Sequence, residues 1–169
     1  MADVLLRTAS ILFLVQGLVY FLIGALTPVM MNRDGGDRIL FFSARSDSAY
    51  FGGDTRELQQ NDPALAKHRD ILFLGLAGLL VSLGAAVMVI AWFAVRQGET
   101  WGYWSLALVG LLAVGFWIVI TWKYVAAGAP VGLGDIPPFM WVTTLLWLAG
   151  VATGVFGLRP SVLGWFART

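Results

Sequence analysis

The chain has 169 residues, of which 59% are hydrophobic and 12% are charged, whereas soluble domains hold roughly 25% charged residues. A soluble fold of this size could not hide so much apolar surface, because small folds leave much of their surface exposed. With 11 basic and 10 acidic residues, the chain has no overall field that would attract nucleic acid. Cysteine is absent and histidine occurs once, which excludes disulfides, thiolate chemistry, iron–sulfur clusters, bis-histidine haem and multi-histidine metal sites.

Four long stretches lack charged residues, and each has the length of one membrane crossing. A helix crosses a hydrocarbon core of about 30 Å with about 20 residues, and its backbone hydrogen bonds all close within the segment. Tryptophan and tyrosine residues cluster near the predicted ends, where amphipathic rings prefer to lie. We therefore predict an all-α integral membrane protein, a single domain over residues 1–169, whose four-helix bundle has transmembrane helices at 8–32, 71–95, 100–122 and 136–158.

Residues 33–70 are the one sizeable hydrophilic element, and we expect them to form an extramembrane loop. Apolar residues on both sides of the polar segment 45–48 favour a hairpin or two interfacial stretches. Asp62 followed by Pro63 indicates a helix start, with Asp62 as the N-cap and Pro63 at the first helical position. The second long helix would then continue to about Arg96, so that one of its ends projects beyond the bilayer.

The third connection and the C-terminal tail differ in composition. Residues 126–138 are rich in glycine and proline, which indicates irregular backbone. Residues 159–169 mix apolar and polar side chains, and we expect this tail to lie along the lipid headgroups. An even number of spans places both termini on one side of the membrane. Net charge favours the cytoplasm for that side although the count of basic residues favours the opposite one. We favour cytoplasmic termini in a bacterial inner membrane.

Small residues recur at helical spacing in the predicted helices. Gly78, Ser82 and Ala86 form a small-xxx-small pattern in the second helix, and Gly150 and Gly154 form one in the fourth. In lipid, helices associate through close backbone approach and dispersion, which such patterns permit. We interpret the patterns as packing within one chain, with packing against other subunits as the alternative.

The sequence contains no recognisable catalytic motif. An ionisable side chain inside a membrane span is a functional hypothesis by default, and the four predicted spans contain none. No nucleophile elbow, P-loop, dinucleotide fingerprint or zinc motif is present, and the acidic residues of the loop match no calcium loop. We expect no intrinsic cofactor and lean towards a protein that is not an enzyme. His68, beside Lys67 and Arg69, is interpreted as a surface residue, with acid–base work or ligation of a metal or pigment as weaker alternatives.

The first functional hypothesis is a non-catalytic subunit of a larger membrane complex, such as an energy-converting or transport assembly. Small residues on every helix and aromatic residues in the long loop suit contacts with other membrane protein subunits and with lipids, because aromatic anchors are typical of interfaces. The candidate residues for this partner interface are Arg38, Phe41, Phe42, Tyr50, Phe51, Gly150 and Gly154.

A second hypothesis is a stand-alone protein, possibly an enzyme, that binds a lipid, a quinone-like molecule, a pigment or another apolar small molecule. Gln16 and Tyr20 are the most polar pair at depth in the first span, and Thr121 lies in the third. These three residues are the candidate ligand site, although an interhelical hydrogen bond is the favoured interpretation of Gln16 and Tyr20. A third hypothesis, an oligomeric channel or transporter, is weakened by the absence of charge in the spans.

Overall fold

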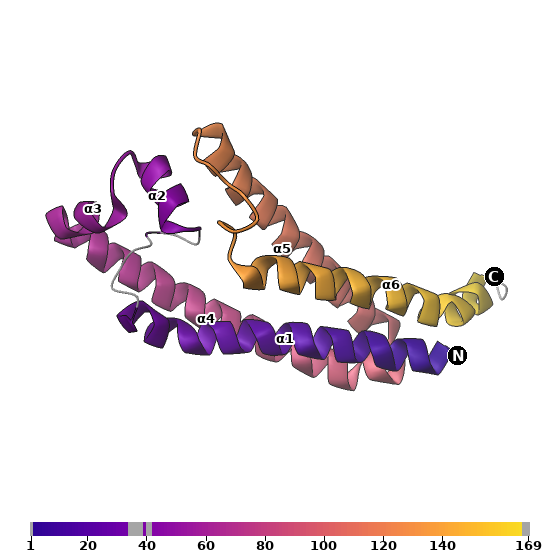
Figure 1. The fold of residues 1–169 in the computed structure, drawn as a ribbon. Coiled ribbons are helices and arrows are strands. Elements are labelled where there is room, and N and C mark those ends of the chain that lie inside the picture. Colours follow the sequence, from indigo (N-terminus) through magenta and orange to yellow (C-terminus); the bar gives the residue numbers. More distant parts are fainter. Residues whose placement is uncertain (1, 34–38, 40–41, 167–169) are drawn as a thin grey trace.

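The computed structural model describes residues 2–33, 39 and 42–166, and these residues form helices, turns and bends without a strand. Four of the helices are long, and two short ones lie between the first and the second long helix in the chain; their arrangement in space is drawn in Figure 1. The prediction of an all-helical chain is confirmed. The elements in chain order are α1 (Ala2–Arg33), α2 (Ala44–Phe51), α3 (Thr55–Asn61), α4 (Pro63–Phe93), the 3-10 helix η1 (Val95–Gln97), α5 (Thr100–Ala126) and α6 (Pro138–Phe166).

Four of these helices are long and apolar enough to cross a membrane, as predicted from the charge-free stretches. Their apolar parts are 29, 35, 27 and 21 residues long, and about 20 residues suffice for a crossing. Helix α5 ends at Ala126, beyond the predicted end at 122. Helix α6 continues to Phe166, so most of the predicted tail 159–169 has helical backbone. The four candidate spans indicate a membrane protein.

The start of α4 is the one predicted from Asp62 and Pro63. The Asp62 carboxylate accepts hydrogen bonds from the backbone N–H groups of Ala64 at 2.9 Å and Leu65 at 3.2 Å. The first N–H groups of a helix have no acceptor within the helix, and the Asp62 carboxylate supplies one. Pro63 occupies the first helical position. The apolar span reaches Gln97 through η1, which agrees with the predicted end near Arg96.

Two short helices occupy part of the segment for which a hairpin or two interfacial stretches were predicted, so the hairpin is wrong, and the interfacial alternative stays a prediction. Ser43 caps α2 by accepting a hydrogen bond from the backbone N–H of Ser46 at 3.3 Å. Asp54 caps α3 in the same way, through two backbone N–H groups. Gly52, with φ of 76°, ends α2 in the left-handed region that glycine adopts without strain. Caps at both ends explain why short polar segments fold as helices here.

Helix α1 lies lengthwise along α4, as Figure 1 shows, and their backbones come close at Gly17 with Gly84 and at Gly24 with Ala77. A Cβ atom placed on Gly84 would lie 2.5 Å from the carbonyl oxygen of Gly17, and one on Gly24 would lie 2.6 Å from the carbonyl oxygen of Ala77. Only residues without a side chain permit this approach, and close approach is what stabilises helix pairs in lipid. Glycines on both helices thus let the backbones of α1 and α4 pack directly against each other.

Helix α6 packs on the other side of α1, where its small residues receive aromatic rings. Gly150 faces the ring of Phe13, and Gly154 faces the ring of Tyr103. These two rings meet edge to face with centroids 6.5 Å apart, and the Tyr103 hydroxyl donates a 2.7 Å hydrogen bond to the carbonyl oxygen of Val151. The Gly150 and Gly154 pattern thus serves packing within the chain, the interpretation favoured from the sequence.

Helix α5 contacts its neighbours along its first half and then diverges from α6, as Figure 1 shows. A tight turn at Gly98, with φ of 81°, joins it to η1. The Trp147 ring of α6 lies over Gly110, and its Nε1 donates a 3.3 Å hydrogen bond to the carbonyl oxygen of Leu106. Beyond this contact the two helices separate, and the connection between them returns along the opening. We call residues 127–137 the connection.

Candidate functional site

Helix α2 binds the connection through hydrogen bonds between residues that are far apart in the sequence. The Ser46 hydroxyl donates a 2.7 Å hydrogen bond to the carbonyl oxygen of Pro130. The backbone N–H of Ser43 donates to the carbonyl oxygen of Asp135 at 3.0 Å, and the Ser43 hydroxyl donates to the Asp135 carboxylate at 2.6 Å. A glycine- and proline-rich connection is thereby held in one position.

A buried carboxylate joins α2 to the end of α5. Asp47 is fully buried, and it accepts hydrogen bonds from the backbone N–H of Ile39 at 2.8 Å and from the hydroxyl of Tyr124 at 2.7 Å. A buried charged group is tolerated only where donors replace the lost water. Asp47 therefore holds both the backbone at Ile39 and the end of α5 in place.

Aromatic rings surround the Asp47–Tyr124 hydrogen bond. Tyr50 of α2 stacks on Tyr124, with ring centroids 4.5 Å apart, and Phe42 packs on it with centroids 4.4 Å apart. Phe42, Tyr124 and Ala129 are the buried members of this cluster. Aromatic pairs at such distances stabilise by roughly 0.5–1.5 kcal/mol beyond their buried area. Together, the rings and hydrogen bonds dock α2 on α5 and the connection, and we call this set of contacts the α2 latch.

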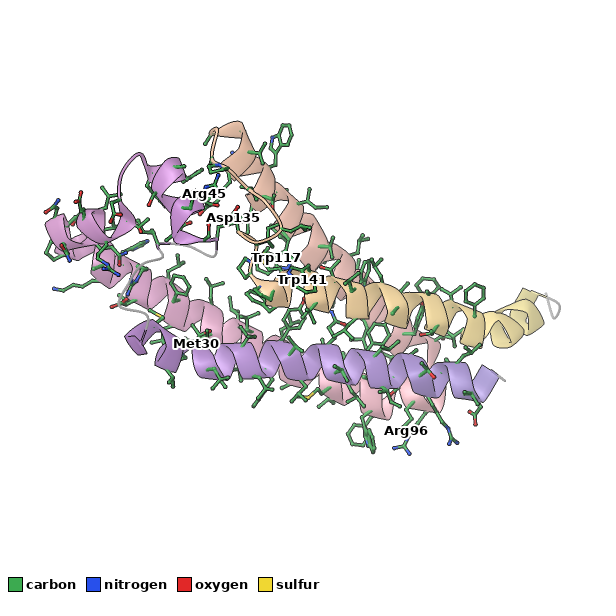
Figure 2. The ribbon with its side chains drawn as sticks, in the orientation of Figure 1. Met30, Arg45, Arg96, Trp117, Asp135 and Trp141 are labelled. Carbon is green, nitrogen blue, oxygen red and sulfur yellow. The ribbon has the colours of Figure 1, made fainter. Side chains whose placement is uncertain are left out.

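Asp135 is the charged group of the connection, and its environment favours the ionised carboxylate. Hydrogen bonds from the Ser43 hydroxyl and from the Gly132 backbone N–H, at 2.6 and 2.8 Å, hold the pKa of Asp135 below its usual range. The positive charge of Arg45 acts in the same direction. Figure 2 shows Arg45 and Asp135 next to one another beside the opening between α5 and α6.

A groove of about 840 Å³ lies between the diverging parts of α5 and α6. The volume falls in the range of roughly 300–1,000 Å³ that is typical of small-molecule sites. Figure 2 shows Trp117 and Trp141 at this opening, on the two helices that form its walls. Its lining residues come from α5, the connection and α6, and they are Val114, Trp117, Ile118, Thr121, Trp122, Val125, Leu133, Gly134, Ile136, Met140, Trp141, Thr144 and Leu145.

The two hydroxyl groups of the groove are bonded to their own helices. Thr121 donates a 2.8 Å hydrogen bond to the carbonyl oxygen of Trp117, and Thr144 donates a 2.7 Å hydrogen bond to the carbonyl oxygen of Met140. Hydroxyls that bond back to the preceding turn have no proton left to donate to a ligand. The walls therefore present carbon atoms and aromatic faces, which suit an apolar ligand.

The structure separates the three residues predicted as a ligand site. Thr121 lines the groove, whereas Gln16 and Tyr20 are not among its lining residues. Both of these lie on α1, each with 4% of its surface exposed, in the contacts of α1 with its neighbours. A shared site for Gln16, Tyr20 and Thr121 does not form around this groove.

The residues predicted for a partner interface have different environments. Phe42 is fully buried against Tyr124, so the expectation of an exposed ring is wrong. Tyr50 is half-buried in the same cluster, while Phe51 is 38% exposed. Gly150 and Gly154 are covered by the rings of α1 and α5, as described above. The remaining two residues, Arg38 and Phe41, lie outside the described part of the chain.

His68 is exposed on the first turns of α4, outside the groove and the α2 latch. Metal sites in proteins are built from several ligands that converge on one point. Within residues 2–33, 39 and 42–166, no group of three or more histidine, aspartate or glutamate side chains is placed to hold a metal ion. The weak hypothesis of a metal or pigment at His68 gains no support from this geometry.

The sequence interpretation missed the residues of the α2 latch. Neither Asp47 nor Tyr124 is among the candidate residues predicted from the sequence. A signal was nevertheless present, because Ser43 is a residue type preferred at the N-cap and Gly52 is one preferred just after the end of a helix. The partners of that helix could not be read from the sequence, since Asp47 and Tyr124 are 77 positions apart.

Comparisons with protein families, with curated proteins and with solved structures found no match for this chain.

Proposed function

We propose that this chain is a non-catalytic subunit of a larger membrane complex, and that the outward face of α4 is its contact surface. The supporting observation is a row of small residues that the described part of the chain leaves uncovered. A Cβ atom at Gly75 or Gly78 would meet no other atom within 4 Å, and Ser82 and Ala86, one and two turns further on, are exposed. We call these four residues the α4 stripe.

The α4 stripe differs from the small residues that the fold itself uses. Gly84 of the same helix faces α1, and Gly150 and Gly154 of α6 face aromatic rings. Small residues lower the dispersion contacts of a helix with lipid but permit close approach of another helix. A stripe left open on a membrane helix therefore favours a transmembrane helix of another subunit over lipid alone.

The experiment compares two glycine substitutions in the full chain, purified from its native membrane in a gentle detergent. Gly78→Leu fills the α4 stripe, and Gly115→Leu is the matched control, because a side chain at Gly115 of α5 also meets open space. We expect stoichiometric membrane partners to be recovered with the control and lost with Gly78→Leu. A monomer without partners, or equal recovery with both variants, would contradict the proposal.

The same proposal includes a placement in the membrane. The four long helices would form a bundle across a bacterial inner membrane, with α2 and α3 outside it on one side and both termini in the cytoplasm. The tight turn between α4 and α5 would then lie on the cytoplasmic side. The chain has no native cysteine, so labelling of a single introduced cysteine reports on which side of the membrane that position lies.

Gln60→Cys, in α3, and Gln97→Cys, in η1, replace exposed residues on opposite sides of the proposed membrane. With a membrane-impermeant maleimide on intact cells, we expect labelling of Gln60→Cys and protection of Gln97→Cys. Both positions should react after lysis, which controls for accessibility. The reverse pattern on intact cells would place the termini outside the cytoplasm.

A second candidate function is favoured by the groove between α5 and α6. We infer that the groove binds an apolar small molecule, because its volume suits one and its hydroxyls are already bonded. Native mass spectrometry of the purified chain is expected to show a retained apolar ligand. Complete absence of bound mass under conditions that keep the fold intact would count against this function.

A further inference from the structure

The groove between α5 and α6 opens sideways, towards the surface that the two spans present to the membrane. Ile118 of α5 and Leu145 of α6 line it, and they are 64% and 59% exposed. Side chains of this kind on membrane spans face hydrocarbon. A ligand that enters between them comes from the bilayer, and the part that occupies the groove is apolar.

One end of the groove is lined by two tryptophans, which favours a position at the level of the lipid headgroups. Trp122, near the end of α5, and Trp141, in the first turn of α6, both line this end, and tryptophan prefers the membrane–water interface. The connection contributes Leu133, Gly134 and Ile136 to the same end. Asp135, between two of these lining residues, therefore marks the place where the apolar groove meets polar surroundings.

The charge at this end is suited to an anion. Each oxygen of the Asp135 carboxylate already accepts a hydrogen bond, one from the Ser43 hydroxyl and the other from the backbone N–H of Gly132. Arg45 is exposed and close enough to act on Asp135 electrostatically, and Figure 2 places its side chain beside the opening. A guanidinium at this depth is available to a phosphate, which it recognises with two parallel hydrogen bonds.

The α2 latch keeps this arrangement in place before any ligand arrives. Ser46 and Ser43 hold the connection through Pro130 and Asp135, and Arg45 directly precedes Ser46 in the chain. The contacts of Ser43 and Ser46 thus hold both the backbone that carries Arg45 and the wall of the groove that the connection forms. A preformed site loses little ordering free energy on binding.

We propose that the groove binds one anionic phospholipid, with an acyl chain between α5 and α6 and the phosphate at Arg45. This inference rests on the second candidate function, the binding of an apolar molecule in the groove, and adds the chemical class of the ligand. A membrane-surface arginine contributes about 1 kcal/mol to the attraction of anionic lipid, which corresponds to a preference of about fivefold.

The test uses the full chain in detergent, incubated with vesicles of equal parts phosphatidylglycerol and phosphatidylcholine, and native mass spectrometry of the bound lipid. The wild-type chain is expected to retain one phosphatidylglycerol, about fivefold more often than phosphatidylcholine. Arg45→Gln is expected to lose that preference while still binding lipid. Lys67→Gln, which removes another exposed cation, is the control and should keep it.

A second pair of variants tests the groove itself. Leu145→Trp fills it, and Leu148→Trp is the matched control, because Leu148 is 49% exposed on the same helix and is not a lining residue. Loss of lipid with Leu145→Trp alone supports the site. Lipid retention equal in both variants would overturn the groove as a binding site.

The two pairs distinguish the two possible failures. Binding of both lipids without preference, yet blocked by Leu145→Trp, would overturn the anionic phospholipid and leave the apolar-molecule function standing. A preference kept in Arg45→Gln would also overturn the role of Arg45. Because both arginine and leucine positions are exposed, unfolding of these variants is not expected, and an unchanged thermal transition checks that each one is folded.

Discussion

The hydroxyl of Tyr124 donates a 2.7 Å hydrogen bond to the carboxylate of Asp47, a residue with no exposed surface. Through this bond the last turns of α5 are tied to α2, which belongs to the segment between the first two spans. Ile39 donates the second bond to the same carboxylate. The hydrogen bond between Asp47 of α2 and Tyr124 of α5 thus joins segments that are far apart in the sequence, and it supports the wall of the groove that the connection forms.

Removal of one donor tests how much the α2 latch contributes. Tyr124→Phe keeps the ring stacked on Tyr50 but leaves a buried carboxylate oxygen of Asp47 without that partner. A buried polar group that loses its partner costs about 1–3 kcal/mol, so the free energy of unfolding should fall by this amount. Denaturant titration of the chain in detergent measures it.

Tyr50→Phe is the control for this experiment, because it changes a tyrosine of the same aromatic stack and leaves the Asp47 bonds unchanged. Its free energy of unfolding should stay close to that of the wild-type chain. If the two variants were equally stable, the Asp47–Tyr124 bond would contribute nothing measurable to the fold.

Two glycines of α4 are predicted to respond to alanine in opposite ways. A methyl group at Gly84 would overlap the backbone of α1 near Gly17, and overpacking of this kind typically costs about 1–3 kcal/mol. At Gly78 the methyl group meets open space, and alanine is favoured over glycine in helices by roughly 1 kcal/mol.

Thermal unfolding of the isolated chain in detergent is expected to show a lower transition temperature for Gly84→Ala. Gly78→Ala should leave the transition unchanged or raise it. A similar loss of stability in both variants would mean that the chain itself covers the α4 stripe, against the open surface seen in the structure.

The lowered pKa of Asp135 predicts a dependence of stability on pH. The hydrogen bonds from Ser43 and Gly132 hold the folded pKa below the ordinary 3.8 of an aspartate. The carboxylate therefore contributes its full stabilisation above about 3.8, and the contribution is lost as the pH falls through the folded pKa. Asp135→Asn removes this titration.

The measurement for Asp135 is the difference in unfolding free energy between the wild-type chain and Asp135→Asn, from neutral pH down past 3.8. The wild-type chain should be the more stable one at neutral pH, and the difference should shrink on acidification. A difference that stayed constant over that range would show that the ionised carboxylate has no role in holding the connection.

Much of the fold could be predicted because its signals are local. Charges in this sequence occur between the spans, so the four membrane helices are visible as uninterrupted apolar stretches, and the Asp62–Pro63 pair carries its own helix start. Helix α2 was missed because its eight residues have no apolar period long enough to detect, and its stability depends on the caps at Ser43 and Gly52.

The candidate site was harder to predict, because it depends on contacts between distant segments. Thr121 was identified as a polar residue in a span, and it does line the groove. Its pairing with Gln16 and Tyr20 assumed that polar residues at depth face one another, whereas the divergence of α5 from α6 separates them. The angle between two helices is set by the packing of residues such as Trp147 on Gly110, and no short sequence pattern encodes it.

Substitution of the N-cap of α4 tests whether Asp62 stabilises only the first turn of that helix or also the long-range contacts of the α2 latch. Asp62→Ala removes the acceptor for the N–H groups of Ala64 and Leu65, and loss of an N-cap typically costs about 1 kcal/mol. Asp62→Asn retains a capping oxygen and should restore most of that stability. Because Pro63 and the cap lie on the polar end of α4, hydrogen exchange should increase only in the first turn in Asp62→Ala. Faster exchange that extended to Tyr124 would instead show that the start of α4 and the α2 latch unfold as one unit.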